Sequence, residues 1–371
     1  MVKVPDYIKA ITPYVPGKPI SEVERELGLT RTIKLASNEN PMGPSSKVVE
    51  AICAAAHDTH LYPDGNAFYL KQELVKYHSA HALKFDEIVV GNGSNEVIEL
   101  AIKALVSHGE EMIISEKAFV VYEIIAQANN IKLHVVPMKE GMVFDIDGYI
   151  ANINEKTKLI CLVNPNNPTG TYYSKADFEK LLNAVPENCI LLVDEAYVDF
   201  VDAIDYPNSL DYFRKHPNMI VCRTFSKAFG LSGLRLGYGI TSAEIADYIN
   251  RVREPFNTNS IVQAAGIAVL KDKEYVAKGV KINKEGKEYF YRELKRLGLE
   301  FVPTQGNFLL VKIGDSSDAG MKCFDFLLKK GVIVRPVAKP YGLPQYIRIS
   351  IGLPDQNEIC VQELENFFKS V

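Results

Sequence analysis

The sequence is organised around one stretch, T-F-S-K-A-F-G-L-S-G-L-R at Thr224–Arg235, which follows an apolar run. A lysine amine forms an imine with an aldehyde only when it is deprotonated, so a reactive lysine needs burial and nearby positive charge to lower its pKa. Arg235 can supply that charge, and Thr224, Ser226 and Arg235 are suitable hydrogen-bond donors for a phosphate. A lysine in a glycine-rich turn is, taken alone, more often a solvated loop residue, so Lys227 needs support from elsewhere in the chain.

Short apolar runs without two-residue periodicity recur on both sides of this stretch, as is typical of strands buried on both faces. Between them, residues 97–105 and 178–185 keep helical spacing. Strands that alternate with helices predict an α/β fold with a mainly parallel, seven-stranded sheet. The seven runs are Ile88–Val90, Met112–Ile114, Leu133–Val136, Leu159–Val163, Ile190–Val193, Met219–Cys222 and Leu236–Ile240.

The two ends of the chain have a different pattern. Six prolines within residues 1–45 predict an irregular arm with one short helix at Ser21–Leu27. After residue 255 a long charged helical segment, Lys273–Leu297, precedes short strands and further helices, which indicates a smaller α+β domain. We therefore expect an arm at 1–45, a large α/β domain at 46–255 and a small α+β domain at 256–371.

Composition excludes several classes of protein. The 371 residues are 47% hydrophobic and 24% charged, the balance of a globular protein with a sizeable core. A net charge of −4 gives no general attraction to nucleic acid or anionic membrane, and no apolar stretch has membrane-spanning length. The six cysteines form no C-x-x-C pair, so we expect a reducing cytoplasm, no export and no metal site.

Three other stretches follow predicted strands and give Lys227 its support. Gly91–Glu96 precedes an amphipathic helix, whose free N–H groups suit an anion, although plain strand-to-helix turns have the same composition. Asn164–Gly170 is, in isolation, a proline-rich turn. Asp194–Tyr197 places a carboxylate at the end of a buried strand, where it is costly without a cation. Open α/β sheets bind ligands at that edge.

Taken together, these four stretches resemble, in order and spacing, the pyridoxal-phosphate-dependent aminotransferases of fold type I over the whole chain. The histidinol-phosphate aminotransferases are the most similar family within that class. The motifs that narrow the resemblance are T-P-Y-V-P-G-K at Thr12–Lys18, A-S-N-E-N-P at Ala36–Pro41, Y-P-D at Tyr62–Asp64, R-P at Arg335–Pro336, Y-G-L-P at Tyr341–Pro344 and I-R-I-S at Ile347–Ser350.

The resemblance implies roles for the residues around the cofactor. Lys227 would form the imine with pyridoxal phosphate and move protons, and Asp194 would keep the ring nitrogen protonated. Tyr197 and Asn167 would bind the phenolic oxygen, and Phe119 would stack on the ring. Phe119 follows Glu-Lys-Ala where the family often has Pro-Thr-Tyr. The cofactor phosphate would bind to Ser94, Asn95, Thr224, Ser226 and Arg235.

The resemblance also implies a homodimer with shared active sites, in which Tyr62 reaches the partner's cofactor phosphate. The substrates would be histidinol phosphate and the pair 2-oxoglutarate and glutamate, in histidine biosynthesis. Tyr14, Asn38, Arg335 and Arg348 would bind the substrate. A phosphate is larger and more highly charged than the carboxylate that an arginine at the Arg348 position binds in related enzymes, so a second arginine and a tyrosine are expected additions.

Two alternatives stay open at this point. An aromatic amino acid aminotransferase or a phospho-amino-acid decarboxylase of the same fold would share every cofactor residue, and only substrate residues separate them. A nucleotide-binding protein that uses Gly91–Asn95 belongs to another class. It is disfavoured because Glu96 replaces the third glycine of the dinucleotide motif and because Lys227 and Asp194 would have no role.

Overall fold

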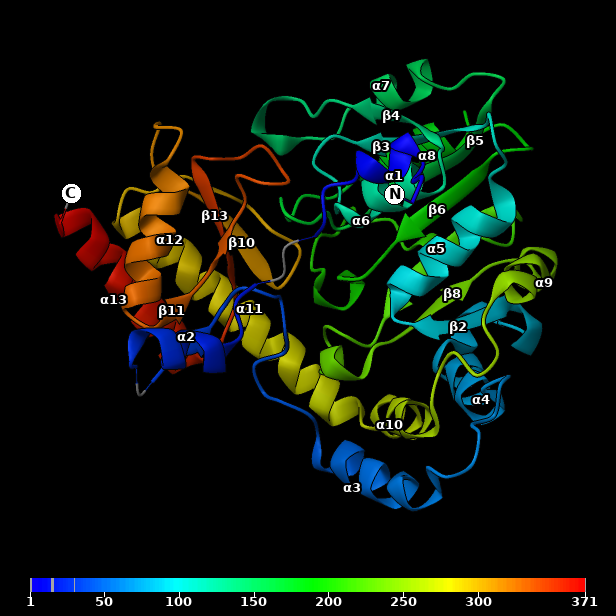
Figure 1. The fold of residues 1–371 in the computed structure, drawn as a ribbon, viewed down its shortest axis with the longest axis horizontal. Helices are drawn as coiled ribbons and strands as arrows, with labels where there is room; N and C mark the ends of the chain where they lie inside the picture. Colours follow the sequence, from blue (N-terminus) through cyan, green and yellow to red (C-terminus); the bar gives the residue numbers. More distant parts are fainter. Residues whose placement is uncertain (1, 15–16, 30, 371) are drawn as a thin grey trace.

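The computed structural model describes residues 2–14, 17–29 and 31–370, and its centre is a seven-stranded sheet (Figure 1). The strand order is β2-β8-β7-β6-β5-β3-β4, and β8 is antiparallel to both of its neighbours while the other pairs are parallel. All seven predicted runs are strands of this sheet, so the α/β prediction is confirmed. The strands are β2 (Ile88–Asn92), β3 (Glu111–Ser115), β4 (Lys132–Val136), β5 (Thr157–Val163), β6 (Ile190–Asp194), β7 (Met219–Thr224) and β8 (Leu236–Ile240).

Helices cover both faces of the sheet because successive strand residues point to opposite sides. In β6, Ile190 and Leu192 pack towards α5 (Ser94–Leu105), α6 (Val121–Ala128) and α9 (Ala243–Val252). Leu191 and Val193 belong to the opposite core, which residues of five other helices complete. These are α3 (Ser46–Ala55), α4 (Phe68–Tyr77), α7 (Ile146–Ala151), α8 (Lys175–Leu182) and α10 (Ser260–Lys271).

A second, four-stranded sheet of order β12-β13-β10-β9 lies beside the long helix α11, and the two sheets occupy separate halves of the molecule in Figure 1. Its core includes residues of the last two helices. The proposed boundary at residue 255 stays a prediction. The elements are α11 (Lys273–Arg296), β9 (Phe301–Val302), β10 (Phe308–Lys312), α12 (Ala319–Lys329), β12 (Arg335–Pro336), β13 (Tyr346–Ser350) and α13 (Pro354–Ser370).

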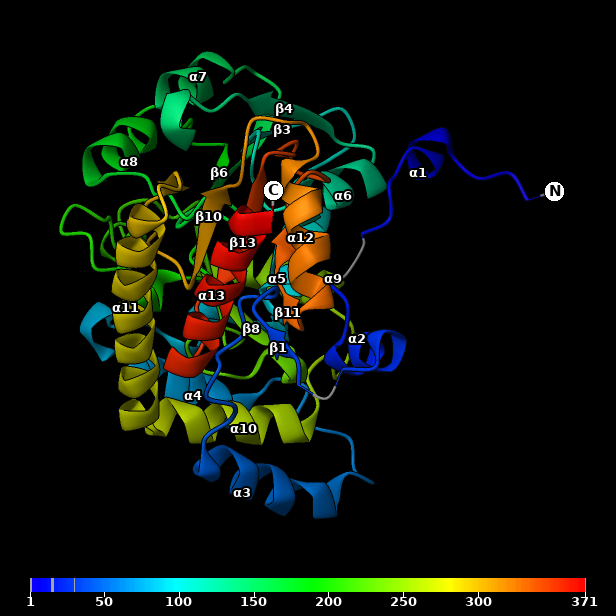
Figure 2. The ribbon, with the colours of Figure 1, turned by 90° about the vertical axis from the view of Figure 1, so that its left-hand side faces the viewer.

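The N-terminal arm contains two helices and a short strand. The strand β1 (Ile33–Lys34) pairs in parallel with β11 (Val332–Ile333), so the arm joins the C-terminal half. The helix α2 (Ile20–Leu27) buries only Val23, and α1 (Asp6–Lys9) buries no residue and stands out from the body in Figure 2. Val15 and Pro16 of the predicted arm motif lie outside the described residues.

Seven short 3-10 helices connect the main elements, and none of the helices in the described ranges is long and apolar enough to cross a membrane. The 3-10 helices are η1 (Ala56–Asp58), η2 (Ser79–His81), η3 (Phe85–Glu87), η4 (Glu140–Met142), η5 (Val198–Phe200), η6 (Ser209–Asp211) and η7 (Ser232–Leu234).

The topology of the large sheet brings five loops to one edge. β2 and β7 are both antiparallel to β8 and therefore parallel to each other, so the carboxyl ends of β2, β3, β5, β6 and β7 meet there. β8 begins at the same edge, directly after Arg235. The residues that the sequence places after each strand are thus gathered in space.

Candidate active site

A cavity of about 580 Å³ lies at this edge of the sheet, within the size range of small-molecule sites. All of the predicted site residues except Tyr62 line it. They come from the arm, from the strand ends of the large sheet and from the small sheet: Tyr14, Asn38, Ser94, Asn95, Phe119, Asn167, Asp194, Tyr197, Thr224, Ser226, Lys227, Arg235, Arg335 and Arg348.

Lys227 lies in the turn after β7, and its Nζ donates a long hydrogen bond to the Ser37 carbonyl oxygen at 3.4 Å. Desolvation in the cavity, with a smaller contribution from the nearby Arg348 guanidinium, lowers the pKa of Lys227 to about 8. The sequence interpretation gave that electrostatic role to Arg235, which contributes less than Arg348. An amine with a pKa of about 8 is partly deprotonated at neutral pH, as an attack on an aldehyde requires.

Asp194 ends β6 and is 4% exposed. One carboxylate oxygen accepts the Tyr122 hydroxyl at 3.0 Å, and the other accepts the Ala196 N–H at 3.2 Å. Burial raises the pKa of Asp194 to about 6, although the hydrogen bond from Tyr122 acts in the opposite direction. A buried carboxylate of this kind is strongly stabilised by a protonated nitrogen placed against it.

A hydrogen-bonded group from three parts of the chain surrounds the side of the cavity next to the small sheet. The Asn38 amide donates to the Tyr197 hydroxyl oxygen at 2.9 Å, and burial raises the pKa of that phenol to about 12. Arg348 donates from Nη1 to Asn167 Oδ1 and from Nη2 to the Ala36 carbonyl at 2.7 Å. Its buried Nε has no hydrogen-bond partner within the described chain, so this guanidinium retains a donor for a ligand.

The opposite side of the cavity is a cradle for an anion at the start of α5. Arg235 Nη1 donates to the Ser226 hydroxyl at 3.2 Å. A Cβ on Gly93 would lie 2.5 Å from Arg235 Nη2, and a Cβ on Gly237 would lie 2.1 Å from the Ser94 nitrogen. Only glycine allows these approaches, which bring the guanidinium and the helix N-terminus together. The cradle, the amine and the buried acid fit the phosphate, aldehyde and ring nitrogen of pyridoxal phosphate.

Two arginines lie side by side at the far end of the cavity. Arg335 and Arg348 are directly opposite each other in the antiparallel pair of β12 and β13, and both line the cavity. The Arg335 guanidinium carbon lies 5.5 Å from the centre of the Tyr14 ring. Like charges opposite each other destabilise a sheet, so the pair marks a place for an anion.

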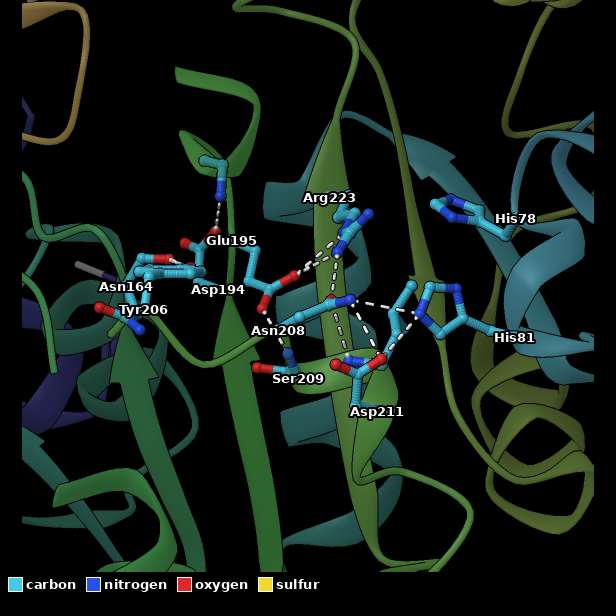
Figure 3. Close-up of polar contacts among 12 residues, drawn as sticks. His78, His81, Asn164, Asp194, Glu195, Tyr206, Asn208, Ser209, Asp211 and Arg223 are labelled. Atoms are coloured by element: carbon cyan, nitrogen blue, oxygen red, sulfur yellow. Dashed lines mark hydrogen bonds and ion pairs between the residues drawn. The ribbon is translucent and has the colours of Figure 1, made fainter. Parts of the chain in front are cut away.

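A buried polar layer lies beneath the strand ends (Figure 3). Glu195 follows Asp194, and Glu195 Oε2 accepts hydrogen bonds from Arg223 Nε at 3.0 Å and Nη2 at 2.7 Å. Its Oε1 accepts the Ser209 N–H at 3.2 Å. These contacts tie residues 195–209, which include Tyr197, to strand β7.

Tyr62 is the predicted site residue that the structure does not bring to the cavity. Its side chain is 83% exposed and stacks on Phe256, with ring centroids 4.7 Å apart. Phe119 does line the cavity, from the turn directly before α6.

The sequence interpretation missed several residues of the site. Tyr122 is the most important because it bonds to Asp194, and its only sequence signal is a position one helical turn after Phe119. Tyr341 also lines the cavity, and it begins a motif to which we assigned no role. Ser37 and Glu39 line it as well, within the A-S-N-E-N-P motif of the arm.

Comparisons with known proteins agree with this geometry. Residues 30–364 match the family model for aminotransferase class I and II. Histidinol-phosphate aminotransferase 2 of Ralstonia nicotianae is 45% identical over 98% of this chain and 96% of its own length. The histidinol-phosphate aminotransferase of Anaeromyxobacter sp. is 44% identical over 98% of both chains. The crystal structure of the Sinorhizobium meliloti histidinol-phosphate aminotransferase in complex with pyridoxal-5'-phosphate is 26% identical, with a TM-score of 0.90 over 100% of this chain and 98% of that one.

Proposed function

Because the chain belongs to the class I and II aminotransferases and, within them, to the histidinol-phosphate aminotransferases, we propose that it transfers the amino group of L-histidinol phosphate to 2-oxoglutarate. The products are imidazole-acetol phosphate and glutamate, in histidine biosynthesis. The resemblance found in the motifs is confirmed by these matches. The protein is an enzyme, and its cofactor is pyridoxal phosphate.

Each residue of the cavity has a different role in the proposed reaction. Pyridoxal phosphate, when bound, supplies an aldehyde for the substrate amine and a ring that accepts the electron pair left when the substrate carbon loses its proton. Lys227 Nζ, with a pKa of about 8, is the group that takes and returns that proton. Asp194 would hold a proton on the ring nitrogen, Tyr197 and Asn167 would bind the phenolic oxygen, and Phe119 would lie against the ring.

A separate set of donors would hold the phosphate end of the cofactor. The Ser94 N–H group at the start of α5 and the Arg235 guanidinium converge on the cradle that Gly93 and Gly237 leave open. The hydroxyl of Ser226 already contacts Arg235, and Thr224 Oγ1 accepts the Ser226 N–H at 3.1 Å, which orders the turn before Lys227. Asn95 and Thr224 complete the proposed set.

The observation that carries the substrate assignment is the arginine pair. An amino acid offers one carboxylate to this end of the cavity, whereas histidinol phosphate offers a dianion. Arg335 and Arg348 are cross-strand neighbours, and Tyr14 lies against Arg335. A dianion satisfies both guanidinium groups and compensates their repulsion. Asn38 lines the same side and completes the proposed substrate residues.

Steady-state kinetics of Arg335→Ala test the assignment. We expect kcat/KM for L-histidinol phosphate to fall by about 100-fold, because one charge-assisted interaction of ~3 kcal/mol is lost. Turnover of phenylalanine should change little. Arg292→Ala, an exposed arginine on α11, is the control. Equal losses for the two substrates would move the assignment to a general aromatic aminotransferase. Release of carbon dioxide from a phospho-amino acid would favour the decarboxylase.

We propose that the enzyme is a homodimer whose second copy contributes Tyr62 to the cofactor phosphate site. The support is the exposed stack of Tyr62 on Phe256, the 60% exposed Leu61 beside it and the projecting helix α1. Large aromatic side chains exposed together are typical of interfaces. Sedimentation equilibrium of the holoenzyme measures the molecular mass, and a monomer would contradict the proposal.

We also propose that the enzyme works in the reducing cytoplasm. All six cysteines are free thiols and only Cys53 is exposed. Cell fractionation against compartment markers checks this placement, and activity confined to an exported fraction would contradict it.

A further inference from the structure

Ser350 is a buried serine of the I-R-I-S motif to which the proposed function assigns no role. It lies in β13, two residues after Arg348, so the two side chains point to the same face of the small sheet. Ser350 is 3% exposed and does not line the cavity. Its hydroxyl contacts Asn38 of the arm, which does line the cavity. Any effect of Ser350 on the site is therefore transmitted by the arm.

Two hydrogen bonds between Ser350 and Asn38 fix the orientation of the Asn38 amide. The Asn38 backbone N–H donates to Ser350 Oγ at 2.8 Å, so the hydroxyl proton of Ser350 points to another acceptor. That acceptor is Asn38 Oδ1, at 2.9 Å. With the amide reversed, the Ser350 proton would have no acceptor among the described residues, which is costly for a buried group. The Asn38 amide nitrogen therefore faces away from Ser350.

The backbone of Asn38 is held in place as well. Asn38 has a φ of 54°, a left-handed conformation that asparagine adopts more readily than most residues. Its carbonyl oxygen accepts a hydrogen bond from the Asn307 amide at 3.0 Å, directly before β10. The position and the orientation of Asn38 are thus both set by residues of the C-terminal half.

The fixed amide determines what the Tyr197 hydroxyl can do. Asn38 Nδ2 lies 2.9 Å from the Tyr197 hydroxyl oxygen, and because an amide nitrogen only donates, that oxygen is the acceptor. The phenol proton then points elsewhere, and no residue in the described part of the chain accepts it. Burial raises the pKa of Tyr197 to about 12, so the phenol keeps its proton at neutral pH. The direction left for the proton is the cavity that Tyr197 lines.

We propose that Ser350 is a positioning residue that acts through Asn38 and makes Tyr197 a hydrogen-bond donor to the phenolic oxygen of the cofactor. Without Ser350, the Asn38 amide can turn, accept the Tyr197 proton and remove this donor from the cavity. The second N–H of the Asn38 amide stays available for the proposed substrate contact. The proposal rests on the proposed role of Tyr197 and does not depend on the identity of the substrate.

The same strand orients the other residue proposed for the phenolic oxygen. Arg348 donates from Nη1 to Asn167 Oδ1, so the Asn167 amide nitrogen is left as a donor. Arg348 and Ser350 therefore act in parallel, one on Asn167 and one, through Asn38, on Tyr197. One face of β13 sets the direction of both hydrogen bonds at that oxygen.

The visible absorbance of the bound cofactor tests the proposal. Donors to the phenolic oxygen stabilise its negative charge, so their loss makes the cofactor hold the neighbouring proton more tightly. Ser350→Ala should raise the pH midpoint of the absorbance change by about one pH unit and weaken pyridoxal phosphate binding to the cofactor-free protein about ten-fold. Thr241→Val is the control, because it removes a buried hydroxyl that donates to the Met219 carbonyl at 2.8 Å, after the far end of β8. It should change neither quantity.

A double variant separates positioning from a general loss of stability. Tyr197→Phe alone should raise the midpoint at least as much as Ser350→Ala, and adding Ser350→Ala to Tyr197→Phe should raise it no further. Ser350→Thr keeps a hydroxyl and should restore most of the shift. An unshifted midpoint in Tyr197→Phe would overturn the role of Tyr197 and the proposal with it. A shift in Tyr197→Phe without one in Ser350→Ala, or an equal effect of Ser350→Ala in both backgrounds, would overturn the proposal alone.

Asn38→Asp provides the same test if Ser350→Ala does not fold. Its carboxylate keeps the hydrogen bond from Ser350 and accepts the Tyr197 proton, so the Tyr197 hydroxyl no longer donates into the cavity. The midpoint should rise, and the rise should shrink when Tyr197→Phe is added. A rise of the same size with and without Tyr197 would overturn the proposal.

Discussion

Asp194 and Lys227 have pKa values that the cavity moves towards each other, to about 6 and about 8. Burial is the main cause in both cases, since it disfavours the carboxylate and the ammonium alike. Near neutral pH, proton exchange with either group therefore costs little free energy. The two side chains are suited to different tasks because Asp194 is bonded to Tyr122, whereas Lys227 has only a long contact with a carbonyl.

Tyr122→Phe should raise the pKa of Asp194, because the hydrogen bond that it removes stabilises the carboxylate. A hydrogen bond of ~1.4 kcal/mol corresponds to about one pH unit. Protonation of Asp194 weakens the binding of pyridoxal phosphate at low pH, and this weakening forms the acid limb of the pH profile of affinity. We expect the midpoint of the acid limb, measured by adding the cofactor to the cofactor-free protein, to rise by about one pH unit. Tyr173→Phe removes a buried hydroxyl that bonds to Tyr149 instead, and it should leave the limb in place. An unshifted limb in Tyr122→Phe would contradict the positioning role.

Asp194→Asn should stabilise the cofactor-free protein while abolishing transamination. The pKa of Asp194 is raised from 3.8 to about 6 on folding, so the folded state binds the proton more tightly and loses stability as pH rises through that window. Above pH 6 the cost reaches about 3 kcal/mol, and Asn avoids it. Urea unfolding at pH 8 and pH 4.5 should show a large gain at the higher pH and a small one at the lower. A variant that is less stable at pH 8 would refute this account.

At the scale of elements, side chains alternate along β6 and β7, so the active-site acid and the buried structural ion pair lie on opposite faces of the sheet. Asp194 points to the face of Tyr122 and α6, while Glu195 and Arg223 belong to the polar layer on the other side (Figure 3). The Glu195 side chain has no exposed area. The loop that carries Tyr197 is thus held to the sheet by an ion pair that does not face the cavity.

Arg223→Met should destabilise the protein by ~3–5 kcal/mol, because it leaves the Glu195 carboxylate buried without its cation. Urea unfolding of the cofactor-free protein measures the loss. Arg296→Met, which breaks a surface pair with Glu365, should cost under ~1 kcal/mol. The double variant Glu195→Leu with Arg223→Met should recover most of the stability. Equal effects of Arg223→Met and Arg296→Met would mean that the buried pair is not a structural tie.

At the scale of the whole molecule, the cavity lies where the large sheet, the small sheet and the arm meet. Lys227 and Asp194 come from the large sheet, Arg335 and Arg348 from the small sheet, and Asn38 from the arm. The arm is tied to the C-terminal half by the pairing of β1 with β11, in a separate two-stranded sheet, and to β13 by the bond of Arg348 to the Ala36 carbonyl. A movement between the two halves would therefore change the distance between the substrate residues and the cofactor residues of the large sheet.

Hybrid dimers test the proposed sharing of the active site. Lys227→Ala alone should abolish transamination, and Tyr62→Ala should weaken cofactor binding severely. Mixing the two inactive proteins should restore up to about a quarter of the activity per chain, because one site of a hybrid dimer has both residues intact. Mixing Lys227→Ala with Asp194→Asn is the control, since both changes lie in the same chain's site. Recovery in the control, or none in the test, would argue against a shared site.

The strands, their sheet and most of the cavity residues followed from the sequence alone, and the physical reason is local. A short apolar run between turns has few structures open to it other than a buried strand, and the carboxyl ends of parallel strands meet at one edge. Asp194, Asn167 and Lys227 each follow such a run, so their proximity was predictable before any side chain was placed.

The tertiary structure decided which partners these residues have. Tyr122 meets Asp194 from a helix 72 residues away in the chain, and Arg348 rather than Arg235 is the main cation acting on Lys227. Lys71 of α4 is buried against Phe85 and beside Arg253, and no motif identified in the sequence indicates that burial. Such contacts depend on how helices pack on the sheet and how the two halves meet. Those arrangements depend on the summed packing of many side chains, which no single motif encodes.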